Sequence, residues 1–561
     1  MPVEREQLVW PVRPAQQARV TFDPPSTETQ IVLPPDILLR YGARILDPGK
    51  AAQPGARRRD RDNLDGQDPG RPVPYQTTAY VAEEILVSAA GQAQNSLVSV
   101  EAQLNEVLKK QPARPGEGAR VAARGDDVTA ALDRARTSSP GVLRLAVEST
   151  ATEPGPPPDA WKVVQQLRDA ATPLEVGLNH LMFAAPAGGQ GFSFGHGFSF
   201  GHGFSFGHGV GAAEYAMPGW GGRMPVRWIG GAPPRTTPSR RPVVAILDTG
   251  VGDHDWFGFG SPDPVVERLY YRRSDGTVQP DDTLGGESQP NIIDRLQGMI
   301  DPFFGHGTFI AGLIHQACPD ARIVSIKMMS NDGIVDEAAL LNGLGYLHQR
   351  QVDALAAGED GVAARVDIVC LALGYYHESD LAGVTYDSRL KQALDDLAAV
   401  GVLVVAAAGN DATSRPMLPA AFTSFRAGTF TGDLGSAPLV SVAALNPDGS
   451  VALFSNEGDW ISCYSPGSVL ISTMPKVDVG LRSSVDLGDG PIDQRPVASW
   501  RASLDPDRFT GFATWSGTSF AAPVMAGAAA RALLEHKTFV DPKADPIVRC
   551  HEVLRTLTFP L

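Results

Sequence analysis

Four side chains of this sequence, Asp248, His306, Asn410 and Ser519, have the types that nucleophilic chemistry requires. A hydroxyl becomes a nucleophile when an imidazole takes its proton, and a carboxylate can hold that imidazole in the required tautomer. An amide can stabilise the negative oxygen that forms when a carbonyl is attacked. Each residue alone has an ordinary explanation as a turn residue, a surface histidine or a helix cap. Together, in this order and with glycines beside them, they are hard to explain by chance.

The elements that must position these residues form an alternating pattern. Apolar, β-branched runs occur at 243–248, 321–329, 366–373, 401–408 and 439–444, and helical patterns at 308–317, 335–349, 388–399 and 519–535. Near-continuous apolar strands separated by helices are typical of a parallel sheet covered on both faces. In such sheets, sites form outside the carboxyl ends of the strands. Asp248 and Asn410 each follow a strand directly, so the pattern predicts a site there.

The position of Ser519 is predicted by a nearby proline. Pro523 is tolerated in a helix only near its first turn, so the helix is expected to begin near Ser519. The hydroxyl and the backbone N–H of Ser519 then lie at the positive end of the helix dipole. A developing negative oxygen would be stabilised at that point.

Residues 242–535 resemble the subtilisin-like serine proteases. The matching segments are Asp248-Thr-Gly250, Gly305-His-Gly-Thr308, Ala407-Ala-Gly-Asn410 and Gly517-Thr-Ser-Phe-Ala-Ala-Pro523. The chain order Asp, His, Ser is also the order found in subtilisin. The resemblance covers a little over half of the chain. It implies an α/β catalytic domain with a subtilisin-like parallel sheet, helices on both faces, and serine endopeptidase activity.

The resemblance also implies roles for individual residues. Ser519 would attack the scissile carbonyl, His306 would transfer the proton, and Asp248 would orient His306. The amide of Asn410 and the N–H of Ser519 would form the oxyanion hole. A protein or peptide substrate would bind as an extra strand between two segments. These are Leu371, Ala372, Leu373 and Gly374 on one side and Ala406, Ala407, Ala408 and Gly409 on the other.

The sequence departs from the family pattern in several places. Ala372 and Phe309 stand where many members have serine and histidine. The segment between Asp248 and His306 is longer than usual, and a second insertion at about 476–510 precedes the nucleophile. The calcium-binding loop of many secreted members is not readable, so we expect no metal and no cofactor.

The front of the chain predicts a second, smaller domain. Residues 1–76 are irregular, with a charged linker at 55–72. A helical pattern at 78–111 and a further helix at 127–136 precede a strand at 142–147, a helix at 159–170 and a strand at 174–184. Asp159 is the expected N-cap of that helix. This strand–helix–strand order is similar to the propeptide of secreted subtilases. The resemblance implies that residues 77–185 form a small α/β propeptide-like domain that acts as an intramolecular inhibitor.

Residues 186–240 read as a flexible linker before a catalytic domain at 241–561. They contain the hexapeptide Gly-Phe-Ser-Phe-Gly-His three times, ending at His196, His202 and His208. Such repeats are usually low-complexity linkers. A histidine metal trap and a recognition or modification tag remain open alternatives. Cleavage within the linker would release the inhibitor, which makes the chain a zymogen by hypothesis.

Composition excludes several classes of protein. Of 561 residues, 43% are apolar and 20% charged, which is ordinary for a globular chain, and no apolar run could span a membrane. Residues 1–240 carry 25 basic and 24 acidic groups, whereas residues 241–561 carry 23 and 39. The acidic second part argues against nucleic acid as a partner. We read no secretory signal and expect a cytoplasmic protein whose cysteines (Cys318, Cys370, Cys463 and Cys550) are free thiols.

Three other interpretations stay open at this point. The chain could be a catalytically silent scaffold that keeps the fold, although all four chemical positions are intact. It could be a narrow processing or regulatory protease, which the large unmatched front part favours. A sedolisin-type site with Glu and Asp is disfavoured by His306 within its Gly-His-Gly-Thr segment.

Overall fold

The structure is a computed structural model, and most of the chain can be described from it. The described residues are 13–14, 31–33, 35–47, 75–88, 97–110, 118–123, 142–150, 155–170, 172, 174–184, 193–194, 223–287, 289–294, 299–379, 389–426, 429–430, 435–477 and 509–558. The charged linker, the expected helix at 127–136, most of the hexapeptide repeats and most of the insertion at 476–510 lie outside them.

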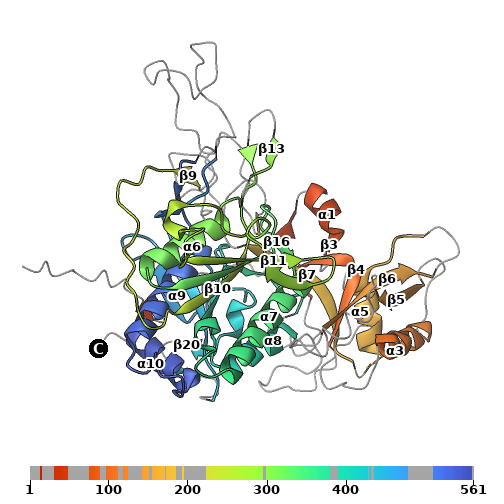
Figure 1. Ribbon diagram of the computed structural model, residues 1–561. Coiled ribbons are helices and arrows are strands. Elements are labelled where there is room, and N and C mark those ends of the chain that lie inside the picture. Colours follow the sequence, from red (N-terminus) through yellow and green to blue (C-terminus); the bar gives the residue numbers. More distant parts are fainter. Residues whose placement is uncertain are drawn as a thin grey trace, which may run out of the picture.

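A nine-stranded sheet forms the centre of the C-terminal part of the chain (Figure 1). Its order is β1-β23-β22-β19-β17-β10-β15-β11-β12. The strands are β1 (Arg13–Pro14), β10 (Val243–Asp248), β11 (Val266–Arg272), β12 (Thr277–Pro280), β15 (Arg322–Lys327), β17 (Ile368–Leu371), β19 (Leu403–Ala407), β22 (Leu439–Leu445) and β23 (Cys463–Pro466). The seven inner strands run parallel, and only the two edge strands pair antiparallel. The expected parallel sheet is confirmed.

Helices cover both faces of this sheet, which explains why strands such as β10 are apolar along their whole length (Figure 1). Helices α6 (His306–Ala317) and α9 (Thr518–Glu535) lie on one face, and α10 (Pro546–Thr558) packs against α9. Helices α7 (Glu337–Ala356) and α8 (Arg389–Ala399) lie on the other face. Gly527 permits the close approach of α6 and α9, because a Cβ atom there would lie 2.5 Å from that of Ala317.

The N-terminal part is a smaller α/β unit with a core of its own. Its sheet contains β3 (Ala43–Ile45), β4 (Ala79–Ser88), β5 (Ala119–Ala123), β6 (Val142–Ser149) and β7 (Val176–Ala184), and it packs against α3 (Leu97–Lys109) and α5 (Ala160–Asp169). Asp159 caps α5 as expected, because its carboxylate accepts the backbone N–H of Trp161 at 3.2 Å. The strand–helix–strand order expected at 142–184 is therefore confirmed.

The helical prediction for residues 78–111 is wrong over its first part. Residues 79–88 form strand β4, and the helix α3 begins only at Leu97. β4 lies between β6 and β7 in the sheet and buries both of its faces. Ile85 and Val87 pack into the N-terminal core, whereas Leu86 packs into the core of the C-terminal part. A strand that is buried on both faces has no alternating pattern, which is why it reads as helical.

Strand β7 joins the two parts of the molecule (Figure 1). Its first half pairs with β4. Its second half pairs antiparallel with β16 (Ile334–Asp336) on one side and with β18 (Leu373–Gly374) on the other. An N-terminal segment covers the end of β7: it contains β2 (Ile31–Val32), which pairs with β8 (Ser193–Phe194), and α1 (Pro35–Tyr41). Leu181 and Phe183 pack against this segment.

The remaining strands form three small sheets. They are β24 (Leu470–Thr473) with β25 (Phe512–Trp515) and β9 (Met224–Pro225), β13 (Ile292–Asp294) with β14 (Met299–Ile300), and β20 (Phe425–Arg426) with β21 (Thr429–Phe430). Within the described residues, no helix has the length and the apolar character that a bilayer crossing requires.

Candidate active site

Asp248 and His306 form a completely buried hydrogen-bonded pair. Asp248 ends β10, and His306 begins α6. The Nδ1 atom of His306 donates to Oδ1 of Asp248 at 2.8 Å, and the backbone N–H of Thr249 donates to the same oxygen at 2.7 Å. A carboxylate that accepts from Nδ1 leaves Nε2 as the basic nitrogen of the ring. Nε2 makes no hydrogen bond within the described part of the chain.

The His306 ring lies against the segment that carries Ser519. It contacts the ring of Trp515 at 5.7 Å and the ring of Phe520 at 5.4 Å, and these residues flank Ser519 in the sequence. Trp515 ends β25, and Phe520 lies in the first turn of α9. The structure thus brings together three residues that 271 positions of sequence separate.

Ser519 is the second residue of α9 and is fully buried. Its hydroxyl donates to the backbone carbonyl of Ala372 at 3.1 Å. The start of a helix has backbone N–H groups without intrahelical partners, and its dipole favours negative charge. The position predicted from Pro523 is accurate to one residue.

Asn410 follows β19 and is held by the loop that precedes Ser519. Its side-chain oxygen accepts the backbone N–H of Thr518 at 2.8 Å. The hydroxyl of Thr518 in turn accepts the N–H of Gly409 at 3.0 Å. Because the carboxamide is held by its oxygen, its NH₂ group is the end suited to donate to a substrate oxyanion.

A buried carboxylate that the sequence did not single out lies behind this pair. Glu287 accepts the N–H of Gly305 at 3.0 Å and the hydroxyls of Thr249 and Thr308 in short hydrogen bonds. Burial raises the pKa of Glu287, and its two threonine donors offset this only in part. Glu287 therefore connects Thr249, the residue after Asp248, by hydrogen bonds to Gly305 and Thr308 on either side of His306. It comes from the long segment between Asp248 and His306, where no local pattern marks it.

Comparison with known proteins identifies the fold that carries this geometry. The model of the subtilase family matches residues 239–545, which is more than half of the chain. The chain belongs to the subtilase family.

Several curated proteins are similar to this subtilase over part of their length. Minor extracellular protease Epr of Bacillus subtilis (strain 168) is 30% identical over 210 residues, which cover 36% of this chain and 27% of Epr. Subtilisin E of the same organism is 23% identical over 234 residues, which cover 38% of this chain and 52% of that protein. The matched region thus spans about half or less of these relatives.

Among solved structures, fervidolysin from Fervidobacterium pennivorans aligns with 83% of this chain and 56% of its own. The sequence identity is 18% and the TM-score is 0.39.

Of the two segments expected to bind substrate, residues 371–374 include the strand that pairs with β7, whereas residues 406–409 lie in and directly after β19. Leu371 ends β17, Ala372 accepts the hydroxyl of Ser519, and Leu373 and Gly374 form β18, which pairs with Ala184 and Phe183 of β7. Ala406 and Ala407 lie inside the nine-stranded sheet, and Ala408 and Gly409 follow it.

Strand β7 pairs with β16 on one side and with β18 on the other, and the role of residues 406–409 in substrate binding stays a prediction. Ala184 donates its backbone N–H to the carbonyl of Gly333 at 2.7 Å, and Ile334 pairs with Phe183. The helical prediction that starts at Val335 is wrong at its first two residues, because α7 begins at Glu337. The turn Asn331-Asp332-Gly333 before two β-branched residues was the signal that a short strand starts there.

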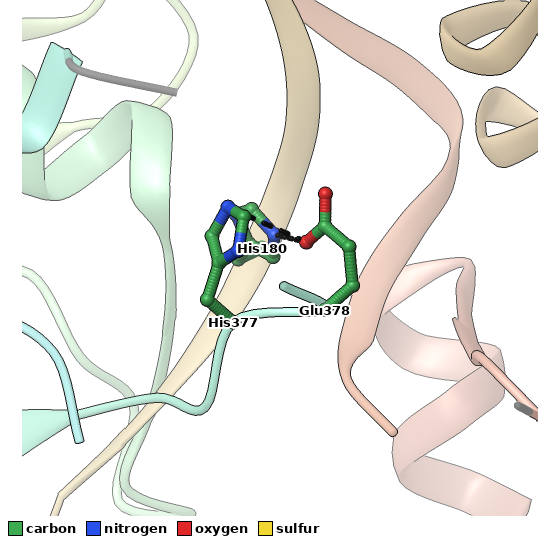
Figure 2. Close-up of side chains that lie close together, drawn as sticks. All are labelled: His180, His377 and Glu378. Carbon is green, nitrogen blue, oxygen red and sulfur yellow. Dashed lines mark hydrogen bonds and ion pairs between the residues drawn. The ribbon is translucent and has the colours of Figure 1, made fainter. Parts of the chain in front are cut away.

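One group of side chains in the described part of this subtilase has metal-ligand spacing. His180, His377 and Glu378 are buried, and their ligand atoms lie within 4.8 Å of one another (Figure 2).

Proposed function

We propose that this subtilase is a serine endopeptidase that is made as a zymogen. The observation that supports it is the buried Asp248–His306 hydrogen bond, with the imidazole packed against two aromatic residues on either side of Ser519 in the sequence. A carboxylate, an imidazole base and a hydroxyl in this arrangement can perform nucleophilic attack on a carbonyl carbon.

In the proposed mechanism, Nε2 of His306 takes the proton of Ser519 as the hydroxyl oxygen bonds to the scissile carbonyl carbon. Asp248 keeps Nδ1 protonated and stabilises the imidazolium that results. The oxyanion accepts from the backbone N–H of Ser519 and from the NH₂ group of Asn410. The imidazolium then protonates the leaving amine. In the second half of the reaction, His306 takes a proton from water, the water oxygen attacks the acyl carbon, and His306 returns the proton to the oxygen of Ser519 as it leaves.

The resting geometry supports an inactive full-length chain. The hydroxyl of Ser519 donates to the carbonyl of Ala372, and the side chains of Asp248, His306 and Ser519 are inaccessible to solvent. The hydrogen bond to Ala372 must break before His306 can take the proton of Ser519. Catalytic hydrogen bonds often form only in the substrate complex, so this geometry is compatible with activity after opening.

The N-terminal domain supplies the block in this proposal. β7 lies in the groove between β16 and β18 as an added strand, which is how an extended peptide binds to strand edges. The N-terminal segment with α1 covers the outer side of the blocking strand. Here Tyr41 donates to Asp332 at 3.0 Å and Arg40 pairs with it at 2.8 Å. The chain would become active after cleavage between residues 185 and 240.

A serine-directed probe tests the enzymatic part of this proposal. We expect a fluorophosphonate to label the chain after cleavage at a protease site inserted in place of residues 195–208. The uncleaved chain should label at least tenfold more slowly. Labelling should disappear in Ser519→Ala and persist in the matched control Ser450→Ala, a turn serine at the surface. If the cleaved, folded chain never reacts, the silent-scaffold interpretation is correct.

Self-incubation tests the zymogen part separately. We expect mass spectrometry to find cleavage between residues 185 and 240 in the wild-type chain and none in Ser519→Ala. A wild-type chain that remains full length and hydrolyses peptides at its final rate from the start would contradict the zymogen proposal. Cleavage of a broad peptide library would contradict a narrow processing role, which the separate N-terminal domain favours.

A further inference from the structure

His180 of the blocking strand β7 lies beside two acidic residues of the catalytic part, of which Figure 2 shows Glu378. Its Nδ1 atom lies 2.7 Å from Oε2 of Glu337, the first residue of α7. Its Nε2 atom lies 2.8 Å from Oε2 of Glu378, which follows β18. All three side chains are completely buried. A carboxylate at each ring nitrogen makes both nitrogens donors, so the ring is a cation.

Other charged groups complete this pocket, which we call the His180 pocket (Glu337, His377 and Glu378). Nε2 of His377 lies 3.5 Å from Glu378, and the ring of Tyr375 lies 4.6 Å from that of His180. Arg389 of α8 approaches Glu337 at 4.0 Å, and Arg415 acts on Glu378 electrostatically. From the N-terminal domain, Arg168 of α5 pairs with Glu378 at 3.3 Å, and Tyr80 lies beside His180 in the sheet.

The pocket loses the cations that lie nearest to its two glutamates when the N-terminal domain leaves, whereas Arg389 and Arg415 stay at a greater distance. His180 and Arg168 leave with that domain, whereas Glu337 and Glu378 stay with the catalytic part. A buried carboxylate without its partner is strongly destabilised. The two glutamates therefore favour any bound strand that brings a cation to the position of His180.

His180, His377 and Glu378 have the spacing of metal ligands. Their contacts indicate a hydrogen-bonded network of protonated groups instead. Both nitrogens of His180 face carboxylates, so neither is available as a metal ligand. Nδ1 of His377 accepts the backbone N–H of Ser379 at 3.0 Å, which leaves the proton of a neutral ring on Nε2. Arg168 and Arg389 also lie near the glutamates, and their positive charge lowers the affinity of the pocket for a divalent cation.

We propose that Glu337 and Glu378 form a subsite of the peptide groove that selects a cationic side chain, with His180 as the chain's own occupant. The proposal rests on the proposed function, because it takes β7 as a strand in the substrate position. Residue 184 pairs with Leu373, so the subsite lies four residues toward the N-terminus of that position. The preferred substrates are extended peptides with Arg, Lys or His there.

Hydrogen exchange of the β7 amides tests the subsite without catalysis, in the full chain with Ser519→Ala. We expect His180→Gln to accelerate exchange by about 10²-fold, because the pocket then buries two carboxylates without the cation. His180→Lys keeps a cation and should exchange within about tenfold of the parent. The control Arg120→Gln, which removes an exposed ion pair of the same domain, should leave β7 exchange unchanged.

A double variant separates charge selection from simple damage to the fold. In the double variant His180→Gln/Glu378→Gln, the β7 amides should exchange more slowly than the two single effects together predict. The reason is that the double variant buries one carboxylate fewer without a cation. Equal exchange for His180→Gln and His180→Lys would overturn the subsite. One equivalent of tightly bound zinc per chain by elemental analysis would overturn it too.

Substrate discrimination is measured in the full-length His180→Gln chain. Peptides based on residues 179–184 should give kcat/KM at least tenfold higher with Arg than with Gln at the His180 position, and lowest with Glu. These ratios do not depend on the fraction of open chains. The preference should vanish in Glu337→Gln/Glu378→Gln, and a preference that survives there contradicts the subsite. If no peptide is hydrolysed although His180 controls exchange, the proposed function fails and the subsite stands.

Discussion

The hydroxyl of Ser519 donates to the carbonyl oxygen of Ala372 at 3.1 Å. Ala372 directly precedes Leu373, which pairs with Ala184 of β7. The hydroxyl is thus bonded to the residue next to the segment that pairs with β7. If the proposed function is correct, the hydrogen bond between Ser519 and Ala372 must break before His306 can act as a base. Binding of a substrate or departure of β7 would break it.

Loss of the Asn410 amide should slow the chemical step. We expect Asn410→Ala to lower kcat by about 10²–10³-fold, the size reported for removal of one oxyanion donor in subtilisin, with little change in KM. The assay uses the chain opened at the inserted cleavage site. Asn446→Ala, which removes an asparagine that bonds only within its own turn, is the matched control. A change in KM alone would assign Asn410 to substrate binding.

A side chain at Gly307 should separate the two buried catalytic groups. A Cβ atom there would lie 2.2 Å from the carbonyl oxygen of Gly250 and 3.2 Å from Asp248. The start of α6 must shift, so Gly307→Ala should lower kcat/KM by about 10²-fold or more. Gly231→Ala is the control, because its Cβ would meet no atom within 4 Å. Full activity of Gly307→Ala would mean that the Asp248–His306 distance is not critical.

Removal of the Glu287 carboxylate should destabilise the catalytic part. In Glu287→Ala, the N–H of Gly305 and two threonine hydroxyls lose their acceptor, and each buried orphan group costs about 1–3 kcal/mol. Glu287→Gln keeps an acceptor and should lose less free energy of unfolding. Urea unfolding of both variants measures the difference. Equal losses would show that the charge of Glu287, and not its hydrogen bonds, is what matters.

Docking of the N-terminal domain should weaken as the pH rises. Burial alone would lower the pKa of His180, but Glu378 and Glu337 outweigh it and raise that pKa to about 10. A free histidine titrates near 6.5, so docking is strongest below about pH 6.5 and is lost progressively toward pH 10. We expect exchange of the β7 amides, corrected for intrinsic rates, to rise by up to about tenfold per pH unit in this window.

The variant His180→Lys provides the control for this pH dependence. A lysine stays cationic through the window because it titrates near 10.4, so its β7 exchange should change little. An identical rise in the two chains would show that another group controls docking.

Asp411 should make the stability of the catalytic part fall between about pH 4 and pH 7. Desolvation by the surrounding protein raises its pKa to about 7, although Tyr376 donates to it at 2.6 Å. The folded state then holds a proton that the unfolded state has lost, so the free energy of unfolding falls as pH rises through this range. Asp411→Asn keeps an acceptor for Tyr376 and should gain stability over the parent as pH rises. A constant difference from pH 4 to pH 7 would contradict the raised pKa.

Local patterns in the sequence predict most of the catalytic part. Asp248, His306, Asn410 and Ser519 lie at the strand ends and helix starts where their neighbours place them. Pro523 restricts the start of α9, and Asp159 caps α5, because both effects act within a few residues. The strands β10, β19 and β22 are recognisable because burial on both faces leaves few polar positions.

Contacts between distant segments are decided only by the tertiary structure. Strand β7 lies between β16 and β18, about 150 and 190 residues further along the chain, and no local pattern specifies such a pairing. The same holds for Glu287 behind the catalytic pair and for His180 between Glu337 and Glu378. The sequence by itself determined which residues can perform the chemistry. The tertiary structure decided which carboxylates are buried beside these residues and which strand pairs with β16 and β18. Burial and charge pairing depend on segments that meet only when the chain folds.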